Sequence, residues 1–259
     1  MNRLFLLILL NVFCGQAIAL TAEEQGLQIV QEVDLRDTGF GDSKSDLKMI
    51  LRNRNGDESV RVLTMKTLEV KGDGDKSLSV FSKPRDIKGT AFLSYTHALV
   101  PDEQWLYLPA LKRVKRISSS NKSGPYLGSE FAFEDLTSFE VKKYKYKYLR
   151  DEVLKDKECF VVEFYPQYKH SGYTRQIVWI DKERYIPIKT DYYDRKDSLL
   201  KTLEQNNYRQ YLKKYWRPDE MLMVNHQNGK STVLVWENYV FRNGFSKRNF
   251  DKATLKRAR

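Results

Sequence analysis

The chain has 259 residues and a formal net charge of +11 at pH 7, from 45 Lys and Arg against 34 Asp and Glu. Aromatic residues make up 13%, with 16 Tyr among them, a composition typical of β-rich proteins. No apolar run reaches the roughly 20 residues that span a bilayer, so the sequence predicts no transmembrane helix.

The first nineteen residues have the pattern of a secretory signal peptide. Arg3 supplies a positive start, Leu4 to Leu10 form a short apolar run, and Ala17-Ile18-Ala19 fits a signal peptidase site. Lipidation of Cys14 is not expected, because the residue before it is bulky where a lipobox needs a small one. We therefore expect a mature periplasmic protein that begins at or near Leu20.

Cleavage would alter both the charge and the thiol content. Loss of Arg3 lowers the net charge by one, to +10, and Cys159 becomes the single cysteine, which excludes an intrachain disulfide. Outside the cytoplasm we expect no nucleic acid partner. The expected acidic partners are anionic lipid head groups, a membrane surface or an acidic protein face. The alternative is that Lys and Arg simply solvate strand faces.

One helix is expected at the start of the mature chain, from Thr21 to Leu35. Thr21 can cap its N-terminus, and Glu24 completes a capping box three residues later. Leu27, Val30 and Val33 then recur at helical spacing and predict a narrow buried stripe.

Two-residue alternation dominates the rest of the chain, from Leu47 to Phe241. It predicts about eleven strands, with hairpin turns at Asn55-Gly56 and Asn228-Gly229. Many short turns and few helices indicate a mainly β protein, in which one large antiparallel sheet curls on itself.

The strictest alternation runs from Lys143 to Tyr148. It places three Tyr on one face of a strand and three Lys on the other, and we favour a packed Tyr face with a solvated Lys face over a basic recognition stripe. The interval from Ser118 to Leu136 breaks the strand rhythm. Its Ser- and Gly-rich composition predicts a long loop with a short helix, which is a candidate lid.

Motifs of catalysis are not found. His97, His170 and His226 stand alone without a second ligand at metal-binding spacing, and Cys159 lies in an apolar strand that predicts a buried, inert thiol. Glu130, Glu134 and Asp135 form a carboxylate cluster that could act as an acid and base pair, but the acidic first turn of a short helix explains these residues equally well. The sequence therefore predicts neither an enzyme nor a cofactor.

An apolar ligand site is the alternative to an ordinary two-sided core. Apolar residues occupy both faces of the strand at residues 105–108, so one face is covered by the core and the other by a lid or a ligand. We expect Leu106 and Leu108 to line the mouth of an apolar cavity beside Phe131 and Phe133 and to touch an acyl chain. The full candidate ligand site is Trp105, Leu106, Tyr107, Leu108, Phe131 and Phe133.

Three cations follow the same strand and could hold an anionic head group or an acidic face of a partner. They are Arg113, Lys115 and Arg116. The alternative is that they are solvated residues of an edge strand.

Three segments carry a resemblance to a known family. They are KGTAFL at 88–93, WLYLPALKRVKRI at 105–117 and GSEFAFEDL at 128–136. With these segments the chain resembles the outer-membrane lipoprotein-sorting proteins, a LolA-like family, from about Ala22 to the C-terminus. The resemblance implies a single periplasmic domain over residues 20–259, folded as a half-open antiparallel β-barrel with helices in its mouth.

The resemblance also implies a function. LolA-like proteins carry acylated lipoproteins towards the outer membrane in an apolar cavity, and members of this group are partnered with inner-membrane RND-type transporters. The first hypothesis is therefore a carrier of lipid or of lipoprotein acyl chains, which predicts a continuous apolar cavity. The second is a non-catalytic interaction or sensor module, or an exporter accessory protein, which predicts a filled barrel and an exposed binding patch.

Overall fold

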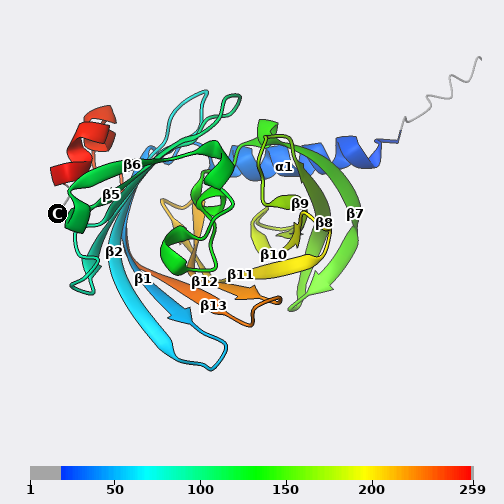
Figure 1. The fold of residues 1–259 in the computed structure, drawn as a ribbon. Coiled ribbons are helices and arrows are strands. Elements are labelled where there is room, and N and C mark those ends of the chain that lie inside the picture. Colours follow the sequence, from blue (N-terminus) through cyan, green and yellow to red (C-terminus); the bar gives the residue numbers. More distant parts are fainter. Residues whose placement is uncertain (1–18, 258–259) are drawn as a thin grey trace, which may run out of the picture.

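The computed structural model describes residues 19–257, which form one thirteen-stranded antiparallel sheet with one α-helix and several 3-10 turns (Figure 1). The strand order is β6-β5-β4-β3-β2-β1-β13-β12-β11-β10-β9-β8-β7, and the sheet does not close, because β6 and β7 remain as its two edges. This confirms the predicted mainly β fold with a curved, half-open antiparallel sheet. The expected signal peptide falls outside the described residues, apart from Ala19.

The elements follow one another along the chain as hairpins. The helix is α1 (Ala22–Asp37), and the strands are β1 (Asp42–Arg52), β2 (Glu58–Leu68), β3 (Lys76–Lys83), β4 (Ala91–Tyr95), β5 (Glu103–Leu108), β6 (Arg113–Ile117), β7 (Tyr144–Leu154), β8 (Lys157–Pro166), β9 (Tyr173–Asp181), β10 (Pro187–Asp194), β11 (Leu199–Tyr211), β12 (Tyr215–Asn225) and β13 (Ser231–Phe241). The 3-10 turns are η1 (Pro109–Leu111), η2 (Ser119–Asn121), η3 (Tyr126–Gly128), η4 (Phe133–Leu136), η5 (Val141–Lys143), η6 (Lys247–Phe250) and η7 (Lys252–Arg257).

The strand count is thirteen, against about eleven expected. β6 is one strand that alternation did not identify, because Lys and Arg occupy three of its five positions and only Val114 and Ile117 are apolar. The structure pairs it along its length with β5, from Gln104 opposite Ile117 to Leu108 opposite Arg113. Charged side chains are typical of edge strands, which β6 is.

The helix α1 begins as predicted. The side chain of Thr21 accepts a hydrogen bond from the backbone N–H of Glu24, and the Glu24 carboxylate accepts one from the backbone N–H of Thr21. The predicted stripe is partly wrong, because Ile29 and Val30 are buried with Gly26 whereas Leu27 is exposed. A Cβ on Gly26 would lie 2.8 Å from the backbone nitrogen of Tyr148, so the helix approaches β7 too closely for a side chain there.

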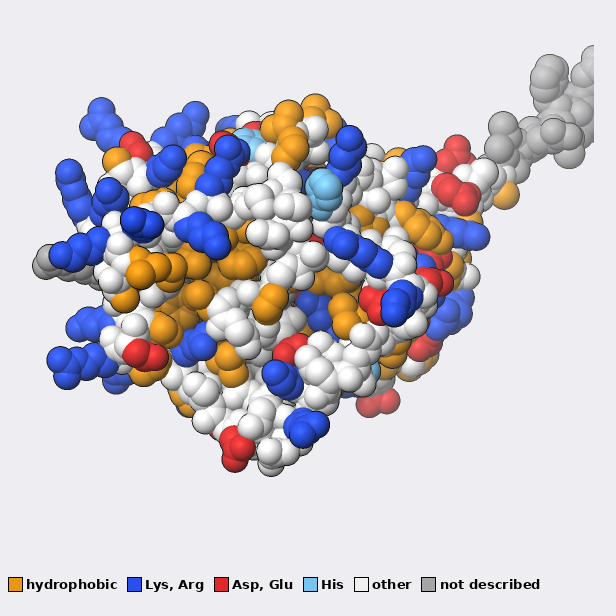
Figure 2. Space-filling model, viewed as in Figure 1, with side chains coloured by type: hydrophobic (Ala, Val, Ile, Leu, Met, Phe, Trp, Pro, Cys, Tyr) orange, Lys and Arg blue, Asp and Glu red, His pale blue; other side chains and the backbone are white. Residues whose placement is uncertain are grey.

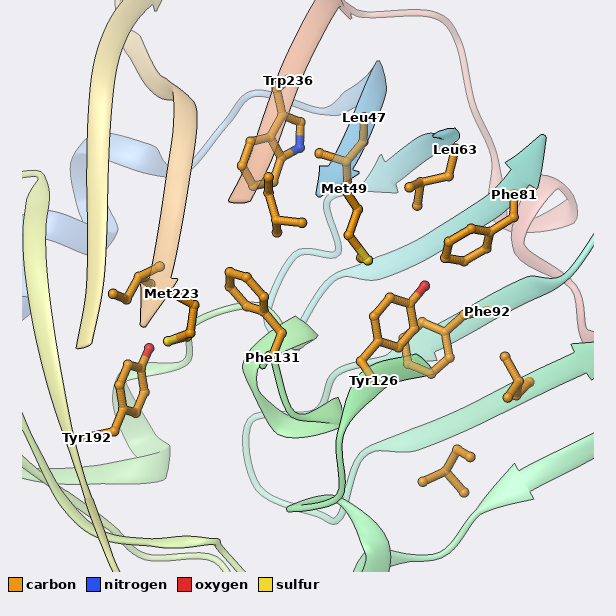
Figure 3. Close-up of a cluster of buried hydrophobic side chains, with 14 of the residues drawn as sticks. Leu47, Met49, Leu63, Phe81, Phe92, Tyr126, Phe131, Tyr192, Met223 and Trp236 are labelled. Carbon is orange, nitrogen blue, oxygen red and sulfur yellow. The ribbon is translucent and has the colours of Figure 1, made fainter. Parts of the chain in front are cut away.

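The concave face of the sheet carries the largest apolar cluster (Figure 3). Figure 1 shows the sheet curving around the segment between β6 and β7, which lies inside the curve. The cluster joins side chains of both halves of the sheet to side chains of that segment. Its buried members are Leu47, Met49, Leu63, Phe81, Phe92, Leu106, Ile117, Tyr126, Phe131, Tyr173, Tyr192, Leu203, Met223, Leu234 and Trp236.

The same concave face also receives α1. Register pairs Leu203 with Thr190 and Thr190 with Val178, and directly paired residues of neighbouring strands share a face. Val178 packs with Ile29 and Val30 of α1 in a second cluster. The helix therefore covers one half of the concave face, and the segment between β6 and β7 covers the other.

The alternation from Lys143 to Tyr148 is confirmed for β7 with one exception. Tyr146 is buried in the cluster beneath α1, whereas Lys145 and Lys147 are exposed. Lys143 was expected on the solvated face, which is wrong. It ends η5 rather than lying in the strand, and its buried ammonium group lies 2.6 Å from the carboxylate of Asp102.

The C-terminal segment covers the convex face of β3, β4 and β5. Phe250 and Leu255 are fully buried there against Leu93 and Trp105. The hydroxyl of Tyr95 donates a hydrogen bond to the backbone carbonyl of Phe250. The turns η6 and η7 thus cover the apolar side chains on this face of the sheet.

Replacement of Phe250 by Ala is expected to lower the free energy of unfolding by about 3 kcal/mol, because a fully buried ring is removed from a packed cluster. Chemical denaturation at neutral pH measures the change. A loss below about 1 kcal/mol would show that the C-terminal segment contributes little to the fold.

Candidate functional site

The segment from Ser118 to Lys143 occupies the concave face as a plug. It contains four short 3-10 turns, and an antiparallel bridge joins Pro125 to Ala132 within it. Tyr126 and Phe131 point into the cluster (Figure 3). The plug corresponds to the predicted lid, but its aromatic side chains fill the curve of the sheet instead of closing an empty space.

Aromatic contacts fix the plug against β3 and β4. The ring centroid of Phe92 lies 5.2 Å from that of Tyr126 and 5.5 Å from that of Phe133. The hydroxyl of Tyr126 lies 2.9 Å from the hydroxyl of Ser79, and burial raises the pKa of Tyr126 above its ordinary value. A single hydrogen bond therefore satisfies the one polar group that the ring carries into the cluster.

A buried ionic anchor holds both ends of the plug. Asp102, at the start of β5, receives the ammonium groups of Lys122 and Lys143, and all three side chains are buried. Burial alone would raise the pKa of Asp102, but the charge of Lys143 and the hydrogen bonds from both lysines outweigh it and hold the pKa below its usual range. The anchor is thus an ion triad with one net positive charge.

A second anchor joins the plug to the other half of the sheet. The ammonium group of Lys201 in β11 donates to the carboxylate of Asp135 at 2.7 Å and to the carbonyl of Glu130 at 2.9 Å. The hydroxyl of Tyr173 donates to Asp135 at 2.8 Å. These contacts draw β9 and β11 towards the plug.

The other two carboxylates of this group are also enclosed by donors. The carboxylate of Glu130 accepts a hydrogen bond from the side-chain amide of Asn225 in β12 at 2.7 Å, and Glu134 has three donors around it. Its oxygens accept hydrogen bonds from the hydroxyls of Tyr168 and Ser171 and from the backbone N–H of Gly172, at 2.8 to 3.0 Å. Burial and the neighbouring Asp135 nevertheless raise the pKa of Glu134. The carboxylates considered as an acid and base pair therefore act as attachment points of the plug in this structure.

Four of the predicted ligand residues lie together in the concave cluster. Leu106 and Phe131 are 7% and 3% exposed, and the half-buried Leu108 and Phe133 pack against the same cluster. Their grouping matches the predicted alternation, which put Leu106 and Leu108 on one side of β5. That side of β5 packs against the plug.

Trp105 and Tyr107 lie on the opposite, convex face. They pack against the C-terminal segment, in the cluster that contains Phe250 and Leu255. Their place follows from alternation, which separates them from Leu106 and Leu108. The structure therefore divides the candidate ligand site between two faces of the sheet.

The three predicted cations divide in the same way. Arg113 pairs with Leu108 and Lys115 with Leu106 across β5 and β6, so these two cations share the concave face with the two leucines. Arg116 pairs with Trp105 on the other face, where its guanidinium lies 3.2 Å from the carboxylate of Glu103. All three are exposed.

Two recesses of the described chain are small or polar. One, of about 50 Å³, is lined by residues of β7, β8, β10 and β11, and the other, of about 320 Å³, lies between β11, β12 and β13, where Trp236 of the concave cluster lines it together with polar and charged side chains. Within residues 19–257, no helix has the length and apolar composition to cross a bilayer. No group of three or more His, Cys, Asp or Glu within that range is arranged to hold a metal ion.

Sequence reasoning missed several side chains that complete the concave face. Tyr126 lies among Ser, Gly and Pro, where no period indicates burial, and Asp102 follows a proline in an apparent turn. The alternation of β12 and β13 was visible and could have identified Met223 and Trp236 as inward residues. What it could not show was that these strands face the plug.

Asp75 makes stability depend on pH near the plug. Burial raises its pKa to about 7, although its carboxylate accepts a hydrogen bond from the backbone N–H of Val70. The folded state therefore binds a proton that the unfolded state releases between about pH 4 and 7, so stability falls as the pH rises through this window.

Replacement of Asp75 by Asn is expected to remove that dependence. The variant should exceed the wild type by about 1–3 kcal/mol at pH 8 and differ little at pH 4, because Asn resembles the protonated acid. Denaturation curves at both pH values test this. An equal effect of the substitution at both pH values would contradict it.

Comparisons with known proteins point in one direction. A family model described as an uncharacterised protein matches residues 73–257. The chain is 54% identical to an outer membrane lipoprotein-sorting protein domain from Vibrio parahaemolyticus, over 90% of this chain and 99% of that one, with a TM-score of 0.89. No curated protein sequence matches the chain significantly.

Two further crystal structures share the fold. A DUF1329 family protein from Desulfovibrio piger is 29% identical, over 91% of this chain and all of that one, with a TM-score of 0.86. A LolA superfamily protein from Nitrosomonas europaea is 20% identical over 91% of this chain and 99% of that one, with a TM-score of 0.71, which is a likeness of fold.

Proposed function

Because the chain belongs to the LolA-like family of outer-membrane lipoprotein-sorting proteins, we propose that it is a non-catalytic periplasmic carrier of lipid or of lipoprotein acyl chains. One observation carries the proposal: an apolar concave face is covered by a separate segment, the plug, and not by a second sheet. Such a face is available to another apolar occupant whenever the segment leaves it.

The exchange of plug and cargo sets two opposing free-energy terms against each other. An acyl chain of sixteen carbons gains roughly 10 kcal/mol on leaving water, at about 0.8 kcal/mol for each buried CH₂. Displacing the plug exposes Phe131 and Tyr126 to water and opens the anchors at Asp102 and Lys201, and this cost opposes the gain. A carrier needs two opposing terms, because it must release its cargo as well as bind it.

The proposed acyl site is the part of the concave face at Leu106 and Leu108, which Phe131 and Phe133 of the plug cover in the closed state. Arg113 and Lys115 share that face and would hold an anionic head group of the cargo. Trp105 and Tyr107 are left out, since the C-terminal segment covers them. The single domain would begin near Leu20 and deliver cargo towards the outer membrane together with an RND-type transporter.

A filled concave face also suits a second function, a non-catalytic interaction or sensor module that accompanies an exporter. In that case the plug would be a permanent part of the core. Mass spectrometry of organic extracts from the natively purified protein separates the two. Co-purifying lipid at a constant molar ratio supports the carrier, and lipid-free protein that also fails to take up added fatty acid supports the module.

Replacement of Leu108 by Glu is expected to abolish lipid uptake with a loss of stability below about 1 kcal/mol. Leu108 is half-buried and directly opposite Arg113, so a carboxylate there meets solvent and a cation. The charge would nevertheless lie where the acyl chain should pass. Fluorescent fatty-acid titration and thermal melts measure the two effects.

Replacement of Leu106 by Glu provides the comparison. This side chain is buried in the cluster, so an uncompensated charge is expected to cost several kcal/mol and to unfold much of the protein. If Leu108→Glu unfolds the protein to the same extent, Leu108 is a core residue. If it binds fatty acid normally, Leu108 is not part of the site.

A further inference from the structure

Two turns at one end of the sheet bring six exposed cations together beside the edge strand. The β3–β4 connection and η1 are neighbours, since a Cβ on Gly89 would lie 3.4 Å from the Cγ of Pro109. We call these six cations the basic rim. They are Lys83, Arg85, Lys88, Lys112, Arg113 and Lys115.

The charge of the basic rim is not neutralised within the described chain. None of its six side chains forms an ion pair among residues 19–257, whereas Arg116 on the other face of β6 pairs with Glu103. The two turns contain a single carboxylate, Asp86. Figure 2 shows Lys and Arg side chains projecting along the side of the molecule that carries β5 and β6, with apolar side chains between them.

An exposed apolar side chain stands at the tip of the same surface. Leu111 in η1 is 63% exposed and precedes Lys112 and Arg113 directly. An apolar tip among cations is the composition of surfaces that lie in the interface of an anionic bilayer. The rim spreads over two turns and a strand, which fits an extended layer of phosphates better than one acidic side chain.

We propose that the basic rim docks the protein on the surface of an anionic phospholipid bilayer, with Leu111 entering the head-group region. The inference rests on the proposed carrier function, which it extends by naming the surface that the carrier meets. Arg113 and Lys115 lie on the concave face opposite Leu108 and Leu106. A bilayer on the rim would therefore adjoin the edge of the proposed acyl site.

Vesicle co-sedimentation of the mature protein tests the docking. Vesicles of phosphatidylglycerol mixed with phosphatidylcholine are expected to bind the protein, whereas pure phosphatidylcholine vesicles should not, and added salt should weaken the binding. Each cation near an anionic surface contributes about fivefold in affinity. A variant with Lys83→Gln, Arg85→Gln, Lys112→Gln and Arg113→Gln should therefore lose at least about 100-fold.

A matched control removes the same number of exposed charges near the opposite edge of the sheet. It changes Lys145, Lys147, Lys169 and Lys196 to Gln, and it should retain most of the binding. Equal losses in the two variants would mean that net charge alone is at work and would overturn the proposal. Replacement of Leu111 by Ser should weaken binding several-fold while leaving its dependence on salt unchanged.

The experiments distinguish failure of the docking proposal from failure of the carrier proposal. If the wild type does not bind anionic vesicles, docking is overturned, even where lipid co-purifies with the protein, and an acidic protein face becomes the partner to seek. If the wild type binds vesicles through the rim but takes up no fatty acid, docking holds and the carrier function is overturned. Melting curves of all variants confirm that each is folded.

Discussion

Replacement of Asp102 by Asn is expected to lower the free energy of unfolding by about 3–5 kcal/mol, because it leaves two buried ammonium groups without a counter-charge. Asp102 is the shared partner of Lys122 and Lys143, one at each end of the plug. The amide can accept a hydrogen bond from one of them but neutralises neither. We expect the plug to detach locally before the sheet unfolds.

The same anchor gives the wild type a dependence on acid pH. The pKa of Asp102 in the folded protein lies below its usual range, so the stabilisation is fully present above about pH 4 and is lost as the pH falls through the folded pKa. The Asn variant should lack this acid-dependent loss. Denaturation at pH 7 and pH 3 measures both effects.

Asp86 provides the control for this prediction. Its side chain is exposed in the β3–β4 connection, and Asp86→Asn should change the free energy of unfolding by no more than about 0.5 kcal/mol. If Asp102→Asn behaves like Asp86→Asn, the ion triad does not hold the plug. The proposed balance between plug and cargo would then rest on aromatic contacts alone.

Most of the strands and the start of the helix could be predicted from local sequence patterns. Alternation located most of the strands but not β6, and the capping box placed the start of α1 at the correct residue. Both signals depend on residues a few positions apart. The number of strands and short turns also indicated a sheet that curls on itself. Its half-open shape came instead from the family resemblance, because local periodicity does not determine whether a sheet closes.

The contacts that define the site are distant in sequence, and that is why they escaped prediction. Lys201 bonds to Asp135 across 66 positions, and Tyr95 bonds to Phe250 across 155. The first contact turns an apparent surface loop into a buried plug. The second belongs to the packing of the C-terminal segment on the convex face of the sheet. Alternation could separate Trp105 from Leu106, but it could not show that this segment covers the face on which Trp105 lies.

Replacement of Phe131 by Ala is expected to raise the affinity for fatty acid by about tenfold. If cargo binds only after the plug leaves, the apparent dissociation constant is the intrinsic one divided by the fraction of open protein. The ring of Phe131 is almost fully buried in the closed state, and its loss should cost that state about 3–5 kcal/mol. A tenfold gain in affinity requires that only about 1.4 kcal/mol of this loss shifts the equilibrium from the closed to the open state of the plug.

Phe250→Ala is the matched control, because it removes an equally buried ring from the opposite face of the sheet. It should lower stability without changing fatty-acid affinity, under conditions in which both variants are folded. A gain common to both variants would reflect general loosening of the fold. Weaker binding by Phe131→Ala alone would mean that the ring contributes more to holding the acyl chain than to excluding it, so the plug would be a wall of the site and not its competitor.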